Sequence, residues 1–170
     1  SINRLKGLNI FGVVEHKVLP GSSDDLRVLK ISVEEQATGE IMAGAGIGTD
    51  GTSFQFAVKE NNWLGRGIKL ESELNLSEDK ISGNISVRNP NYNYSGNSVL
   101  AALDVSSTDR SSTTGFSSSR TGFTLGTSFE QYENIFFSPE INTEWEDIET
   151  DATASAQIKK MEGNYFNTDF

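Results

Sequence analysis

Few residues in this chain could carry out covalent or metal chemistry. The 170 residues contain a single histidine, His16, and no cysteine. A thiolate metal site and a disulfide are therefore impossible within them. A lone histidine also lacks the second ligand, nucleophile or base that a metal site or a catalytic triad requires. We interpret His16 as an ordinary strand residue and expect neither a metal ion nor a cofactor.

Three further patterns suggest chemistry at first sight, and each has a simpler explanation. Glu71 and Glu73 share one face of a strand, where two carboxylates could act as acid and base, but such a row is more often a solvated face. Gly44-Ala45-Gly46 has the glycines of a nucleotide loop, but no helix pattern follows it. The serines between positions 106 and 119 have no base among them and predict a loop. We therefore expect a protein that is not an enzyme.

The composition narrows the choice of partner. The formal net charge is −10 and the isoelectric point is about 4.5, whereas nonspecific binding to nucleic acid depends on Lys and Arg meeting phosphates. No run of 18 apolar residues occurs, so the sequence predicts no transmembrane helix, and its first residues do not resemble a signal peptide. A membrane location is still open, because a transmembrane β-strand gives a far weaker hydropathy signal than a helix.

The elements that must position these residues are β-strands. From Ile41 onward apolar and polar side chains alternate, which is the period of a strand. Phe54, Phe56 and Val58 fall on one face, for example, and Gln55 falls on the other. We count about seven strands joined by hairpins, with a tight turn at Asp50-Gly51 after the first strand and the seventh strand over 135–145, followed by the start of an eighth. Many strands have about nine to eleven residues, the span of a tilted strand across a bilayer.

Two architectures fit this alternation. A soluble β-sandwich buries its apolar faces between two sheets, whereas a transmembrane barrel turns them to lipid and the polar faces to an aqueous lumen. The connections favour the barrel. One end of an up-and-down sheet would collect long polar loops at 106–120 and 147–162. The other end would have shorter turns and would collect the aromatic residues expected at a membrane interface, namely Trp63, Tyr92, Tyr94 and Tyr132.

The first part of the chain has a different character. Residues 1–8 fit the end of a short helix, and residues 11–34 fit a β-hairpin with a turn-rich loop at 20–25. We interpret them as the tail of a small α/β module. The expected fold is therefore mainly β, with the first half of an up-and-down antiparallel transmembrane barrel after the module. Open strand edges are costly in lipid, so we expect an internal piece of a longer protein whose other strands close the barrel.

Three stretches carry a resemblance to a known family. The stretch "GAGIGTDGTSFQFAVKENNWLGRG" (44–67) resembles the BamA family of outer-membrane assembly proteins, at the point where the last periplasmic POTRA domain enters the barrel. Residues 2–41 look like the final helix and hairpin of that POTRA domain. The stretch "VRNPNYNYSGNSV" (87–99) looks like the second periplasmic turn of the family. The resemblance implies a POTRA part at 1–38 and the first strands of the barrel at 39–170.

The function is implied by the same resemblance. Members of the family form a sixteen-stranded barrel in the outer membrane of Gram-negative bacteria, with POTRA domains in the periplasm, and they fold and insert other barrels. Their clients are nascent outer-membrane proteins, and their partners are accessory lipoproteins and outer-membrane lipid. The first strand pairs weakly with the last and forms a lateral gate. That strand matches Ile41, Met42, Ala43, Gly44, Ala45, Gly46, Ile47 and Gly48.

The sequence suggests a physical reason for a weak first strand. Gly44, Gly46 and Gly48 have no side chains to pack, and glycine weakens the interior of a strand. An edge that can open is a template for an incoming strand, so the mechanism would be strand pairing without covalent chemistry. A translocation or autotransporter-assembly barrel of the same superfamily is the close alternative, and a soluble β-sandwich binding module is the alternative from another class.

Overall fold

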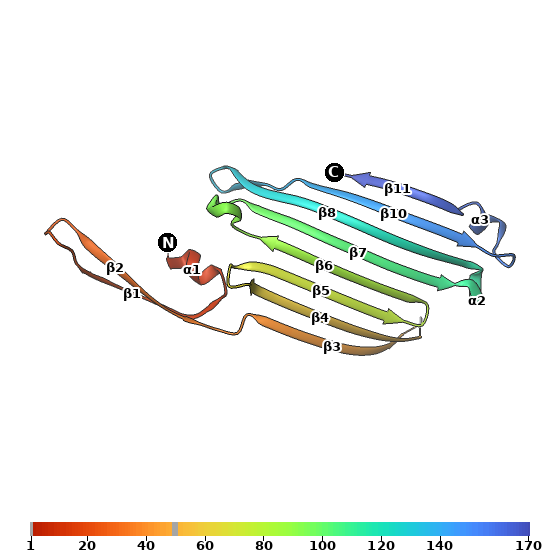
Figure 1. Cartoon of the computed structure of the whole chain (residues 1–170), viewed down its shortest axis with the longest axis horizontal. Coiled ribbons are helices and arrows are strands. Elements are labelled where there is room, and N and C mark those ends of the chain that lie inside the picture. The colour runs from red at the N-terminus through yellow and green to blue at the C-terminus, as the bar shows by residue number, and fades with distance from the viewer. Residues whose placement is uncertain (1, 49–50) are drawn as a thin grey trace.

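The structure, a computed structural model, describes residues 2–48 and 51–170 and consists of one large sheet and one small hairpin (Figure 1). The short helix α1 (Ile2–Gly7) leads into strands β1 (Phe11–Pro20) and β2 (Arg27–Glu35). These two strands pair with each other and with no strand of the large sheet in the described part of the chain. The predicted helix and hairpin are therefore confirmed, while the domain boundary after residue 38 stays a prediction.

The large sheet is antiparallel, and its strands follow one another in chain order. Its path is β3-β4-β5-β6-β7-β8-β10-β11, with β9 paired to β8 beside the path. The bounds are β3 (Gly39–Gly48), β4 (Gly51–Trp63), β5 (Ile68–Ser77), β6 (Lys80–Asn89), β7 (Ser98–Arg110), β8 (Phe116–Tyr132), β9 (Ile135–Phe137), β10 (Glu140–Thr150) and β11 (Gly163–Asp169). The expected seven strands and the start of an eighth correspond to the eight strands of this path.

The register gives the sheet two chemically distinct faces. Phe54 lies opposite Ala45 on one side and opposite Leu76 on the other. Apolar residues therefore align from strand to strand and form what we call the apolar face. Gln55 lies opposite Gly44 and Asn75 in the same way, on the polar face.

Within residues 2–48 and 51–170, no second layer covers either face. The buried hydrophobic residues in the described part of the chain are two alanines, Ala57 and Ala154, and Phe54 and Phe56 of the apolar face are 47% and 48% exposed. A β-sandwich would bury that face against another sheet. The soluble sandwich considered from the sequence is therefore excluded as the fold of these residues, and the up-and-down barrel sheet is confirmed.

The Ser/Thr-rich stretch at 106–120 is mostly strand, which corrects the expected loop. β7 continues to Arg110 and β8 begins at Phe116, leaving only the helical turn α2 (Ser111–Thr114) and Gly115 between them. Ser and Thr suggested a loop because their hydroxyls bond to nearby backbone. They also pair well across strands, and Ser107 lies opposite Ser119 here.

The expected contrast between long loops at one end and short turns at the other is also wrong. The connection at 151–162, which contains α3 (Ala156–Lys159), is long, but the connections at 78–79 and 111–115 at the same end are short. The connection at 90–97, which contains η1 (Tyr92–Tyr94), is among the longer ones and lies at the other end. Loop length therefore does not distinguish the two ends.

Two further sequence expectations concern the turn at Asp50-Gly51 and membrane-spanning helices. Gly51 opens β4 with φ at 83°, a backbone angle that suits glycine, while Asp50 lies outside the described residues. Among the helices that the structure describes, none has the length and hydropathy needed to cross a bilayer.

Candidate functional site

Strand β3 forms one edge of the large sheet. It pairs with β4 from Gly39, opposite Glu60, to Gly48, opposite Gly51. Its other edge pairs with no strand in the part of the chain that the structure describes, as Figure 1 shows. A row of backbone donors and acceptors is therefore available to another strand along its whole length. All eight residues of the predicted gate strand, 41–48, lie on this edge.

The side chains of β3 contribute little to its attachment. Ile41 and Ile47 are 83% and 90% exposed. A Cβ atom added to Gly44 or Gly48 would meet nothing within 4 Å. β3 is therefore held mainly by its backbone ladder with β4, because side-chain pairs, which normally stabilise neighbouring strands, are scarce along it.

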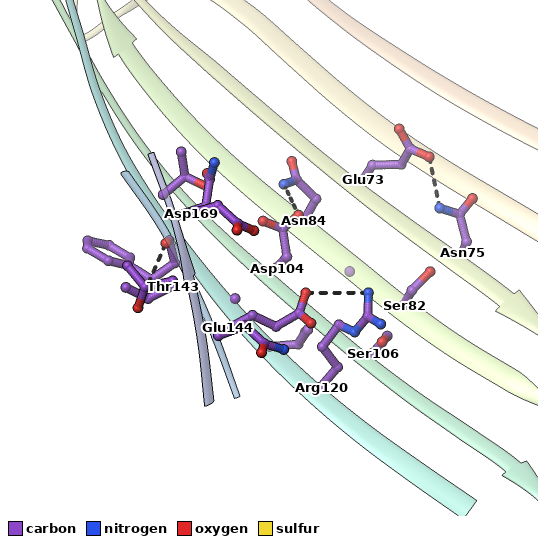
Figure 2. Close-up of a pocket in the computed structure, with 18 residues that line it drawn as sticks. Glu73, Asn75, Ser82, Asn84, Asp104, Ser106, Arg120, Thr143, Glu144 and Asp169 are labelled. Atoms are coloured by element: carbon purple, nitrogen blue, oxygen red, sulfur yellow. Dashed lines mark hydrogen bonds and ion pairs between the residues drawn. The ribbon is translucent and has the colours of Figure 1, made fainter. Parts of the chain in front are cut away.

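The polar face carries a hydrogen-bonded network above a hollow of about 660 Å³. Residues from six neighbouring strands, β5 to β8, β10 and β11, line this hollow (Figure 2). The Asn84 amide of β6 donates to the Asp104 carboxylate of β7 at 2.6 Å. The Thr124 hydroxyl of β8 donates to the Asn142 side chain of β10 at 2.7 Å. Such polar side chains suit a wall that faces water.

Arg120 is the cationic centre of this network. Its guanidinium lies 3.4 Å from the Glu144 carboxylate and 3.6 Å from that of Glu146. Arg120 projects from β8 and both glutamates project from β10, and Glu146 lies directly opposite Arg120 in the register. The ion pairs are half-exposed, so each contributes at most about 1 kcal/mol, and their main effect is to fix side-chain orientation.

The two candidate carboxylates of β5 lie on this polar face, as the sequence predicted. Glu73 accepts hydrogen bonds from the side-chain amides of Gln55, at 2.9 Å, and Asn75, at 2.8 Å. Glu71 lies opposite Lys59 of β4. The partners of Glu73 are amides of the wall itself, an arrangement that fits a polar lining better than an acid–base pair. His16 lies apart from them on β1, opposite Ile31.

No group of three or more acidic or histidine side chains within residues 2–48 and 51–170 is arranged to hold a metal ion.

The hydrogen bonds and ion pairs of the polar face were not predicted from the sequence. Polar residues do stand at alternate positions of successive strands in the sequence, but only the register identifies which of them meet.

The predicted interface aromatics lie at one end of the sheet, which we call the aromatic end. Trp63 ends β4, Tyr92 and Tyr94 form η1 between β6 and β7, and Tyr132 ends β8. Because successive strands run in opposite directions, these positions share an end (Figure 1). All four side chains are exposed, Tyr94 to 92%. The structure brings them together, and their contact with a membrane stays a prediction.

The opposite end carries a tightly built contact between two connections. The Asp151 N–H donates to the Gly115 carbonyl at 2.8 Å, joining the loop after β10 to the turn after β7. The Thr153 hydroxyl and backbone N–H both donate to the Asp151 carboxylate, and these bonds hold the pKa of Asp151 below its ordinary value. This loop is therefore folded against its neighbour.

One aromatic element was assigned differently from the sequence. Residues 135–145 were expected to form one strand, but the strand is interrupted at Ser138 and Pro139, which separate β9 from β10. Pro139 has no N–H to donate to the ladder, and this residue is the signal that marks the interruption. β9 pairs with the far end of β8, where Phe137 lies opposite Phe129.

Comparison with known proteins adds a family and a fold. Residues 62–170 match the Omp85 superfamily domain. The chain is similar in structure to a crystal structure of BamA from Haemophilus ducreyi that lacks POTRA domains 1–3, with a TM-score of 0.74 and 19% sequence identity. The match covers 99% of this chain and 35% of that one, so this chain spans about a third of the length of the matched chain. At this identity the likeness concerns the fold.

Proposed function

Because the chain belongs to the Omp85 superfamily, we propose that it is part of an outer-membrane insertase that folds and inserts β-barrel proteins. Superfamily membership and the barrel-type sheet support a location in the bacterial outer membrane. In this proposal the apolar face contacts lipid and the polar face lines the lumen. The hairpin of β1 and β2 is the end of a POTRA domain and lies in the periplasm.

The observation that carries the proposal is the open edge of β3. A strand that presents its full backbone ladder, with few side-chain contacts to its neighbour, can pair with an incoming strand by β-augmentation. In the closed barrel this edge would meet the last strand, and their separation would open a lateral gate. Nascent outer-membrane proteins are the proposed clients, with accessory lipoproteins and outer-membrane lipid as partners.

The proposed mechanism involves no covalent step, so the protein is not an enzyme. What supports this part of the proposal is the chemistry of the polar face. Its carboxylates have hydrogen-bond or register partners in the wall itself, as Glu73 and Asp104 do. The work of the protein would then be to align backbone groups and to perturb the bilayer locally.

A covalent lock on the gate tests the mechanism. In the full-length protein, Ala45→Cys is combined with a cysteine at the facing position of the last strand, and insertion of a client barrel into liposomes is measured. We expect the oxidised disulfide to block insertion and reduction to restore it. The matched control joins two strands away from the gate, with Ser86→Cys and Ala102→Cys, which face each other across β6 and β7.

The control disulfide should leave insertion unchanged, because these strands need not separate. Normal insertion of the client with the gate locked would show that insertion does not require separation of the first and last strands. A locked gate that instead blocks only secretion of a soluble passenger, while barrel insertion proceeds, would favour the related translocation barrel of the same superfamily.

A further inference from the structure

At the aromatic end, the hairpin of β8 and β9 extends beyond the end of β7 and lies beside the connection at 90–97. β7 begins at Ser98, opposite Ser128, so β8 has no partner on that side from Phe129 to Tyr132 in the described chain. β11 reaches β10 only as far as Asn142. Four residues of strand correspond to about 13 Å. We call this two-stranded overhang, residues 129–137, the ribbon (Figure 1).

The ribbon is preformed. Its turn is fixed by Asn134, which has φ at 62° and donates its backbone N–H to the Glu130 carboxylate at 2.8 Å. The rings of Phe129 and Phe137 pack edge to face, with centroids 5.7 Å apart and an interplanar angle of 68°. A frayed loop would show neither feature, so the ribbon presents a defined shape.

The ribbon also exposes large apolar and aromatic side chains. Tyr132 is 69% exposed, Ile135 58% and Phe137 57%. Residues 121–139 contain no Lys or Arg, and the charged residues among them are Glu130 and Glu133. Acidic groups do not attract the phosphates of anionic lipids or nucleic acids. The surface therefore fits an apolar or zwitterionic partner.

One side of the ribbon continues the apolar face. Leu125 belongs to that face, and Phe129 follows it at an even spacing along β8, with Phe137 directly opposite. Phe136 projects to the other side, where it lines a cavity together with Leu5 and Leu8. The ribbon thus has one side continuous with the membrane-facing surface and one side turned toward the N-terminal helix.

We propose that the ribbon is a membrane wedge: Phe129 and Phe137 insert into the zwitterionic phospholipid interface at the aromatic end of the barrel. This inference rests on the proposed function for its membrane setting. Aromatic side chains are at home at this depth, and a rigid overhang would hold them against the leaflet beside the barrel. The wedge would anchor the barrel at its aromatic end and disturb lipid order next to β8 and β10.

Spin labels at three positions test the wedge. Single-cysteine variants Phe137→Cys, Phe136→Cys and Leu125→Cys of the full-length protein, with any other cysteine replaced, are labelled and reconstituted in phosphatidylcholine liposomes. Collision rates with oxygen, which concentrates in lipid, and with a water-soluble nickel chelate are measured. We expect an oxygen-to-nickel ratio several-fold higher at 137 than at 136, and highest at 125, in the middle of the apolar face.

The outcomes separate this inference from the proposed function. Oxygen-rich collisions at 125 with nickel-rich collisions at 137 would overturn the wedge and leave the membrane barrel intact. Nickel-rich collisions at 125 would overturn the barrel itself. A label at 137 that is nickel-accessible in the purified barrel and protected only when accessory proteins are added would identify a protein-docking surface and overturn the lipid assignment.

A second measurement covers the case in which the cysteine variant fails to fold. Phe137→Trp keeps an aromatic ring at the position, and its fluorescence in liposomes containing phospholipid brominated near the headgroup is compared with that of the unchanged protein. The added tryptophan should be quenched by the shallow bromines. If the brominated lipids do not quench the added tryptophan fluorescence but an aqueous quencher does, the ribbon lies in water and the wedge is overturned.

Discussion

At the scale of single residues, the sharpest constraint is a glycine in a turn. Gly115 has φ at 74°, a region that residues with a Cβ atom rarely adopt. A Cβ atom there would lie 2.5 Å from the backbone nitrogen of Ala154 and 2.6 Å from the Thr153 hydroxyl oxygen. Both the backbone angle and the neighbouring loop therefore require glycine at this position.

Gly115→Ala should loosen the contact between the two connections. We expect a local cost of about 1–3 kcal/mol from the strained angle and the clash, seen as faster amide exchange at Asp151, whose N–H bonds to Gly115. Gly65→Ala is the matched control, because Gly65 has φ at 68° but open space around its Cβ direction. If both substitutions have the same local free-energy cost, the cost comes from the backbone angle alone and packing of Gly115 against the neighbouring loop adds nothing to it.

At the scale of elements, β3 differs from the strands in the interior of the sheet. An interior strand such as β6 has a full ladder on both edges, while β3 has one ladder and few side-chain contacts. Local stability in proteins follows the density of such contacts. β3 therefore separates from the sheet at a lower cost than an interior strand such as β6, which is the property that a gate requires.

Gly44→Thr should strengthen β3 and slow client insertion. The site has room for the side chain, and replacing a strand glycine stabilises by about 1 kcal/mol, which corresponds to about fivefold in an opening equilibrium. Amide exchange of β3 and insertion rate would be measured together in the full-length protein. The control is Gly83→Ala on β6, where an added Cβ makes ordinary contact, 3.6 Å from Val105.

The control variant should leave the insertion rate unchanged. If Gly44→Thr slows exchange in β3 while insertion proceeds at the normal rate, opening of β3 does not limit insertion. If both variants slow insertion equally, the effect comes from overall stiffness of the barrel.

At the scale of the whole molecule, the two faces of the sheet determine where it can reside. The apolar face is continuous from β3 to β11 and has no covering layer among the described residues. Across the same sheet, the polar face carries hydrogen-bonded amides, carboxylates and an arginine. A single sheet with this division suits a boundary between lipid and an aqueous lumen.

A charge placed on either face tests this assignment. Phe56→Lys in the full-length barrel should reduce the free energy of unfolding in liposomes by about 2–4 kcal/mol, because a charge at mid-membrane depth faces lipid. The neighbouring Gln55→Lys should change it by less than about 1 kcal/mol, because position 55 faces the lumen and lies near the Glu73 carboxylate. Equal losses in urea titrations would contradict the assignment of the faces.

Strand pattern was predicted well from the sequence, and connections were predicted poorly. Alternation at positions such as Phe54 and Phe56 reports a strand directly, because side chains of a strand point to opposite faces. The Ser/Thr-rich composition of residues 106–120 predicts a loop, because Ser and Thr hydroxyls bond to nearby backbone. The strands in this stretch are stabilised by cross-strand pairs such as Ser107 and Ser119. The sequence alone does not show which residues pair across strands.

The sequence by itself determined that strands alternate from Ile41 onward, that Trp63, Tyr92, Tyr94 and Tyr132 fall in turns or at strand ends, and that a glycine-rich strand comes first. These are local properties, because propensity, period and turn chemistry act over a few residues. Only the tertiary structure decided that Arg120 meets Glu144 and Glu146, that β8 and β9 pair beyond the end of β7, and that β3 has an open edge. Those properties depend on register, the alignment of residues far apart in the chain.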